Sequence, residues 1–286
     1  MDDLPELFWT EMCRNLLNET AVSAGTKLAG HFGKAAADAL ENAAFHMVRM
    51  MNGKFVDNGY LSQFRKIIVD RVRLPTVSRK YHWYTSVRIS TEFGEYFSDP
   101  AALENLFAAT KGQRIFLSLQ TANLSAELEK WIESIPVCFS LHVAAAVPKL
   151  PESLIQKKTL IHLRFLESDQ INDETTNQLL QLLKQAQFNH VCFSGLSQSN
   201  VKNLVAHWRE NSSAMAGKAI WCEDQVIPQL ELGFRRCTAE EIHYCNRYYP
   251  LFKKICNADT LIIKNKNDAR LYCLFAPGGE TVFVLA

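Results

Sequence analysis

Short apolar segments alternate with longer amphipathic stretches through the middle of the chain. The short segments have the length and alternation of β-strands, and the longer stretches carry apolar residues at helical spacing. The predicted strands are residues 85–91, 114–120, 137–143, 160–166, 190–194 and 218–222. One strand and one helix recurring roughly every 20 to 30 residues is typical of repeat proteins. The sequence therefore predicts an α/β fold, with a leucine-rich-repeat-like solenoid over residues 81–225.

The region before the repeats, residues 1–80, is predicted to be a helical N-terminal region. The segment 34–51 is rich in alanine, which favours a helix, and Asn52–Gly53 is a helix stop signal. A further helix is predicted over 62–72, after a hairpin whose turn would be Asn58–Gly59. We expect these elements to cap one end of the solenoid.

The last region, residues 226–286, combines one predicted helix with a set of strands. Thr238 and Glu241 have the spacing of a capping box, so Thr238 should begin the helix. Strands are predicted over 260–264, 270–275 and 281–285, joined by turn-forming residues into a meander. We expect this small β-rich region to cover the open end of the solenoid.

Charge limits the classes of function. Lys and Arg number 31 against 30 Asp and Glu in the 286-residue chain. This balance argues against the broad positive surface of a nucleic-acid-binding domain. The densest basic and aromatic cluster, residues 65–84, fits a solvated face with aromatic anchors better than an RNA-binding surface. We therefore do not expect a nucleic acid partner.

The first residues of the chain and its cysteines bear on the cellular compartment that we expect. Acidic residues occupy the positions where a signal peptide would be positively charged. No apolar run approaches the ~20 residues needed to cross a bilayer. We therefore expect a cytoplasmic or nuclear protein without membrane association, whose 8 cysteines are free thiols.

Motifs for common chemistries are missing from the sequence. It contains no phosphate-binding loop, no GxGxxG, no HExxH and no GxSxG. Cys237, His243, Cys245 and Cys256 are close in sequence but lack the CxxC-like pair of most zinc sites, so we interpret them as packed side chains. The sequence favours a protein without enzymatic activity, metal or cofactor. A Cys/His nucleophile remains an alternative, because sequence does not reveal the pKa of a thiol.

The strands offer the best candidate binding surface. Successive strand residues point to opposite faces, and we predict that Ile89, Leu119, Leu141, Phe165, Phe193 and Trp221 point into the core. The opposite, concave face would then carry a mixed polar row that suits a protein partner. Its candidate binding residues are Arg88, Phe116, Gln120, His142, Arg164 and His190. The alternative is an ordinary solvated face, which also carries polar residues.

The N-terminal segment carries a family resemblance. Leu4–Pro5 followed by a helix with leucines at its end resembles the start of an F-box. With irregular repeats and the terminal Arg270-Leu-Tyr272 segment, the plan is similar to nematode F-box-like and F-box-associated proteins. The resemblance implies a substrate-recognition adaptor of a cullin-RING ubiquitin ligase. Its contacts to the ligase linker protein would be Leu4, Pro5, Phe8 and Met12.

Two functions therefore stand as predictions, both of them protein–protein interaction. In the first, the N-terminal helices bind the ligase linker protein and the concave face binds a substrate. In the second, the chain is a stand-alone scaffold or regulator, its N-terminal helices only cap the solenoid, and it has no connection to ubiquitin.

Overall fold

The chain is an α/β protein with a mixed, open sheet. The computed structural model describes residues 8–9, 12–13, 19–42, 44–62, 68–69, 82–90, 100–121, 124–144, 149–166, 173–228, 230–249 and 255–286. Its residues divide into two compact units, 1–118 and 119–286, and each unit contains a hydrophobic cluster of its own.

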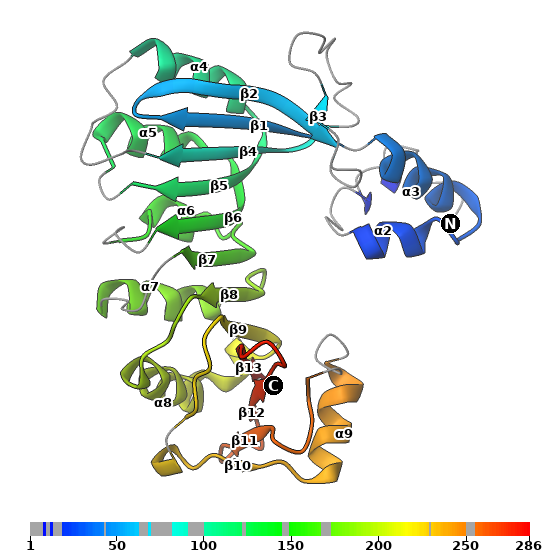
Figure 1. Cartoon of the computed structure of the whole chain (residues 1–286), viewed down its shortest axis with the longest axis vertical. Coiled ribbons are helices and arrows are strands. Elements are labelled where there is room, and N and C mark those ends of the chain that lie inside the picture. Colours follow the sequence, from blue (N-terminus) through cyan, green and yellow to red (C-terminus); the bar gives the residue numbers. More distant parts are fainter. Residues whose placement is uncertain are drawn as a thin grey trace. The chain divides into compact units, whose positions relative to one another are not determined.

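The first unit joins a helical part to a small mixed sheet (Figure 1). Its helices include α2 (Glu19–Gly25), α3 (Gly30–Asn42) and α4 (Pro100–Thr110). Its strands are β1 (Ala44–Met51), β2 (Lys54–Ser62), β3 (Ile68–Val69) and β4 (His82–Ser90), and β5 (Arg114–Gln120) crosses into the second unit. The order is β4-β1-β2-β3, with β1 parallel to β4 and antiparallel to β2.

The prediction of a helix over 34–51 is wrong in its second half. Helix α3 ends at Asn42, and residues 44–51 form strand β1. Side chains alternate along this strand, since His46, Val48 and Met50 are buried and Arg49 is exposed. A period of two is the pattern of a strand with one covered face, and it outweighs the helical preference of the alanines before it.

The hairpin forms at Asn52–Gly53, not at the predicted Asn58–Gly59. Asn52 and Gly53 both have positive φ, 48° and 73°, which a tight two-residue turn between antiparallel strands requires. Asn58 and Gly59 lie inside β2, paired with Val48 and Met47. The helix predicted over 62–72 is also wrong at those of its residues that the structure describes, because Ser62 ends β2 and Ile68–Val69 form β3.

The helical part of the first unit has a small core of its own. Trp9 and Cys13 pack with Val22 of α2 and with the alanines of α3. Gly33 permits the close approach of the preceding turn, because a Cβ atom there would lie 1.8 Å from the Leu28 carbonyl oxygen. The predicted N-terminal helical packing therefore exists in the described residues up to Asn42, and strands β1, β2 and β3 follow it.

The second unit contains a run of parallel strands with helices between them, followed by antiparallel strands. The first group is α5 (Ala126–Ser134), β6 (Val137–Ala144), α6 (Glu152–Gln156), β7 (His162–Leu166), α7 (Asp173–Leu183), β8 (His190–Phe193), α8 (Gln198–Met215) and β9 (Lys218–Cys222). The second group is η1 (Leu230–Leu232), β10 (Arg235–Arg236), α9 (Ala239–Tyr248), β11 (Leu261–Lys264), β12 (Arg270–Phe275) and β13 (Thr281–Leu285).

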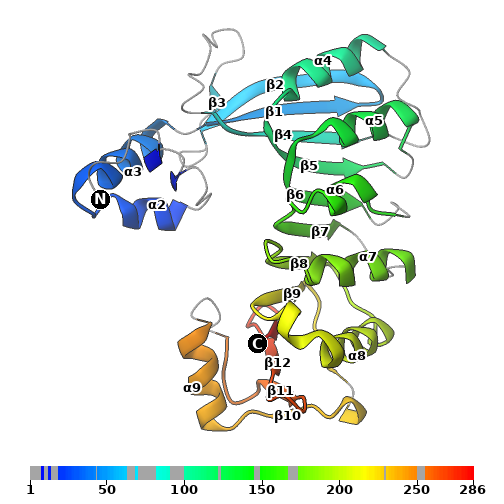
Figure 2. The ribbon, with the colours of Figure 1, turned by 180° about the vertical axis from the view of Figure 1, so that it is seen from behind.

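Strands β6, β7, β8 and β9 are parallel neighbours in chain order, as the sequence predicts. Helices α5 to α8 lie along one face of these strands (Figure 2). Leu163, Phe165, Val191 and Phe193 are buried on that face. The regular helix between each pair of strands explains the parallel order, because a helical connection returns the chain to the same edge of the sheet.

The C-terminal strands form the predicted meander. β11, β12 and β13 pair antiparallel in order, and β13 then pairs antiparallel with β9. The predicted capping box is also confirmed: the Thr238 hydroxyl accepts a hydrogen bond from the Glu241 N–H, and the Glu241 carboxylate accepts one from the Thr238 N–H. None of the helices in the described residues has the length and apolar character needed to cross a membrane.

Candidate functional site

The face of β6–β9 opposite α5–α8 changes character along the sheet. On β6, β7 and β8 it carries His142, His162, Arg164, His190 and Cys192, all half-buried, and we name these five residues the polar strip. On β9 the same face carries Ala219 and Trp221, which are the register partners of His190 and Cys192. The polar strip therefore ends at β8.

Helix α9 covers the apolar continuation of this face. Ala219 belongs to a buried cluster with Tyr272, Val282 and Val284, and α9 contributes the buried Cys245 to it. Trp221 packs against the same cluster. One face of the sheet is thus closed by a helix on β9 and the meander. On β6–β8 it carries the half-buried polar strip, next to the buried Cys138 and Ser140.

The structure corrects the orientation that the sequence predicts for Trp221. Aligned with Phe193, it was predicted to point into the core beneath the repeat helices. The register pairs Trp221 with Cys192 and pairs Cys222 with Phe193, so Trp221 lies on the opposite face, beside α9. The strand segment Lys218–Cys222 is almost entirely buried on both faces. Its sequence therefore shows no apolar and polar alternation that would distinguish the face under the repeat helices from the face under α9.

The other five residues predicted to point into the core are buried, among them Leu141 and Phe165. Of the predicted binding residues, Arg88 is exposed and Phe116, Gln120, His142, Arg164 and His190 are half-buried. His142, Arg164 and His190 come together on the polar strip. Cys192 and His162 belong to the same surface, and their alternation with buried neighbours is the sequence signal that identifies them.

A pair of histidines lies at the centre of the polar strip. His162 and His190 are register partners on adjacent parallel strands. Their Nδ1 atoms are 3.1 Å apart, and their ring centroids are 4.2 Å apart. At this distance one imidazole donates its Nδ1–H to the other, which requires that at least one ring be neutral. Cross-strand register thus brings together two residues 28 positions apart in the chain.

Burial keeps the imidazoles of the strip neutral. It lowers the pKa of His142 to about 4, with a further contribution from the charge of Arg164. Burial, together with the charges of His190 and His142, lowers the pKa of His162 to about 4. The pKa of His190 is lowered by burial as well. At neutral pH the three rings therefore offer hydrogen-bond donors and acceptors without a net charge.

Arg164 supplies the strip's positive charge and is paired. Its guanidinium forms a salt bridge with Glu223, and both side chains are 43% exposed. The Cys192 sulfur lies 3.8 Å from the same carboxylate. Burial raises the pKa of the Cys192 thiol to about 11, so the sulfur is protonated at neutral pH and lacks the thiolate of a nucleophilic cysteine.

The cysteines of the C-terminal region are also packed side chains. Cys245 and Cys256 are buried in the cluster beneath α9, and Cys237 packs against it. Burial raises the pKa of Cys237 to about 12. Cys256 has its pKa lowered by the neighbouring Cys245 thiol, but it is only 6% exposed. No group of three His, Cys, Asp or Glu side chains in the described residues could hold a metal ion.

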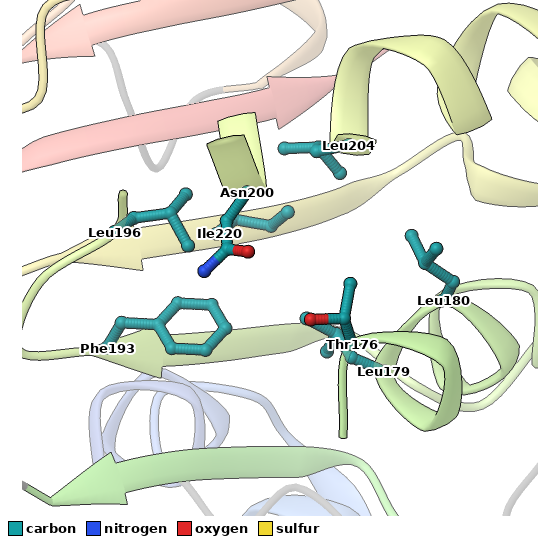
Figure 3. Close-up of a pocket in the computed structure, with 8 residues that line it drawn as sticks. All are labelled: Thr176, Leu179, Leu180, Phe193, Leu196, Asn200, Leu204 and Ile220. Atoms are coloured by element: carbon teal, nitrogen blue, oxygen red, sulfur yellow. The ribbon is translucent and has the colours of Figure 1, made fainter. Parts of the chain in front are cut away.

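A cavity between α7 and α8 is too small for a substrate (Figure 3). It encloses about 20 Å³, which is room for roughly one water molecule. Its walls are Thr176, Leu179, Leu180, Phe193, Leu196, Asn200, Leu204 and Ile220. With six of its eight wall residues apolar, it is a packing gap under the helices and not a ligand site.

Two parts of the sequence-predicted sites lie outside the described residues. These are Leu4 and Pro5 of the predicted linker-protein contact, and most of the basic and aromatic cluster over 65–84. Phe8 and Met12 are described, and they are exposed by 44% and 38%. No protein-family model, curated protein or solved structure matches the chain.

Proposed function

We propose that the chain is a non-enzymatic protein-binding module whose partner binds on the polar strip. The observation that carries this proposal is the change along one sheet face, from apolar residues covered by α9 to the five half-buried residues of the polar strip on β6–β8. A partner on β6–β8 would extend the coverage that α9 already provides on the neighbouring strands.

The composition of these strands favours binding over simple solvation. Strands β6, β7 and β8 contain no Lys, Asp or Glu, although these residues dominate solvated surfaces. Histidine, arginine and cysteine occupy the strip instead. Interface cores are depleted in Lys, Glu and Asp and enriched in Arg and aromatic residues. The strip therefore resembles an interface more than a surface kept soluble by charge.

We also infer that residues 81–225 form a leucine-rich-repeat-like solenoid, with the strip on its concave side. The consecutive parallel order of β6–β9 and the helices α6, α7 and α8 between them support this interpretation. In such a fold each strand contributes one position to a continuous binding row, which is how repeat proteins recognise protein partners.

Arg164→Glu tests the proposed binding site. We expect at least tenfold weaker retention of the partner, because the change reverses the charge at the centre of the strip beside Glu223 and a central arginine is a frequent hot spot. The measurement is quantitative affinity capture from cell extract, followed by titration of each captured protein against the purified chain.

Arg236→Glu is the matched control, since Arg236 is an exposed arginine on β10. It should leave the retention of the same protein unchanged. Equal retention by both variants, with both melting as the parent does, would remove the polar strip as the binding site.

A second proposal, that the N-terminal helical part binds a ligase linker protein, rests on the exposure of Phe8 and Met12. The two residues are four positions apart, which places them on one side of a helical turn. Trp9 and Cys13, one position later in each case, are buried against α2 and α3. The helical residues thus bury one apolar side and expose another, which suits an adaptor role; the alternative is a stand-alone scaffold.

The double variant Phe8→Asp/Met12→Asp should abolish co-purification with the linker protein if the adaptor proposal is correct. Charges on the exposed side would prevent apolar contact while leaving Trp9 and Cys13 packed. Leu28→Asp is the control, since Leu28 is an exposed apolar residue of the same unit. If the unaltered chain never associates with the linker while the strip still binds its partner, the stand-alone scaffold is correct.

A further inference from the structure

The His162–His190 pair has the geometry of two ligands for one metal ion. A transition metal binds imidazole nitrogen at about 2.0–2.1 Å. Two such bonds closing on nitrogen atoms 3.1 Å apart would meet at an angle of about 100°. This angle lies between the square-planar and tetrahedral values, so the separation of the two nitrogen atoms suits one ion bound to both rings.

The rings are held in place by the sheet and not by flexible loops. His162 is in β7 and His190 is in β8, and the buried residues Leu163 and Val191 follow them in the same register. The aromatic rings of Phe165 and Phe193 stack at 5.0 Å on the other face of the same two strands. Ligands fixed on rigid elements lose little freedom on binding, which favours chelation by the pair.

The charges around the pair permit a cation. Arg164, the nearest positive residue of the strip, is paired with Glu223, and strands β6 to β8 contain no lysine. The pair supplies two ligands only, and the described residues hold no group of three. The remaining coordination positions would be taken by water, or by a donor from a bound molecule.

We propose that His162 and His190 form a two-histidine site for a divalent first-row transition metal ion. Imidazole ligands suit Ni²⁺, Cu²⁺ and Zn²⁺, and Cu²⁺ generally binds most tightly among them. Ca²⁺ and Mg²⁺ prefer oxygen ligands and are excluded by the chemistry of the pair. The site does not depend on the proposed function, because an ion can bind with no partner on the strip.

Ni²⁺ is the probe, because it takes imidazole ligands and does not oxidise the chain's free thiols. The untagged, metal-free full chain is titrated with Ni²⁺ by calorimetry at neutral pH. We expect one equivalent to bind, with affinity at least tenfold lower in His162→Gln and in His190→Gln. The double variant should lose no more affinity for Ni²⁺ than either single variant, since a single remaining histidine cannot chelate the ion. Glutamine keeps a polar side chain of similar reach, so the strands should remain folded.

His243→Gln and Cys192→Ser are the matched controls, at an exposed histidine on α9 and at the thiol next to the pair. Both should bind Ni²⁺ as the parent does. Broadening of the His162 and His190 ring resonances by paramagnetic Ni²⁺ gives an independent readout. If both glutamine variants bind Ni²⁺ like the parent, or if other histidines broaden instead, the pair only shares a proton and the proposal is wrong.

Discussion

Replacing Trp208 with alanine will lower the free energy of unfolding of the chain by about 4 kcal/mol. Trp208 is fully buried on α8, on the same face as the buried Val201, Leu204 and Val205. Removing the indole leaves a large cavity, because neighbouring side chains in a close-packed core collapse only in part. Urea denaturation followed by far-ultraviolet circular dichroism measures the change.

Trp208→Phe separates packing from hydrogen bonding at this position. The indole Nε1–H of Trp208 is buried, with no acceptor among the described residues. Phenylalanine removes that unsatisfied donor as well as some volume, so its cost should be only about 1–2 kcal/mol. Lys202→Ala, at an exposed position of the same helix, should change stability by less than about 0.5 kcal/mol. A cost below about 1 kcal/mol for Trp208→Ala would contradict the packing described for α8.

Glu241→Ala will destabilise the chain by about 3 kcal/mol. The Glu241 side chain is 7% exposed and accepts hydrogen bonds from Arg235 at 2.7 and 2.8 Å. It also accepts from the Thr238 N–H at 2.9 Å and lies 3.0 Å from the Lys264 Nζ. The substitution removes both the helix cap and the shared anion. Because Arg235 and Lys264 are partly exposed, water solvates their charges in the variant, and this limits the loss of stability.

The contribution of Glu241 will depend on pH. The Arg235 guanidinium, with the Thr238 N–H and Lys264, holds the pKa of this carboxyl far below its ordinary value of 4.5. A lowered folded-state pKa gives stability that is fully present above the unfolded value and is lost as pH falls toward the folded value. The difference between the parent and Glu241→Gln should therefore be constant near neutral pH. Below about pH 4.5 it should shrink, by at most about 1.4 kcal/mol per pH unit.

Glu240→Gln controls for the loss of one acidic residue in the same helical turn. Glu240 is exposed, and its substitution should change stability by less than about 0.5 kcal/mol. Denaturant unfolding of the three proteins from neutral pH down to pH 3 measures both effects. A Glu241→Gln difference that stays constant through acid would show that the carboxylate contributes through packing and not through its charge.

Local sequence signals predicted the second unit well. Strands β9, β12 and β13 begin and end at the residues that the sequence predicted. The capping box at Thr238 could be recognised in the sequence because both of its partners lie within one helical turn. Each of these features depends on residues near one another in the chain, so no knowledge of the fold was needed.

The first unit was harder to predict because two local signals competed. Alanines favour helix up to Asn42, and a period-two pattern begins immediately afterwards in β1. Asn52–Gly53 and Asn58–Gly59 are both good turn pairs, and only strand pairing selects the first. Turn propensity is a property of a dipeptide, whereas the choice between two turns depends on which residues the adjoining strands can pair and bury.

The sequence by itself determined the alternation of strands and helices, the helix cap and the polar character of His142, Arg164 and His190. Tertiary structure alone decided that Trp221 lies on the face that α9 covers, that the strip residues on the same face of β6–β8 stay half-buried, and that His162 meets His190. The physical reason is that periodicity reports which face of an element is covered. Register and the position of a packed helix arise from contacts between residues that are distant in the chain.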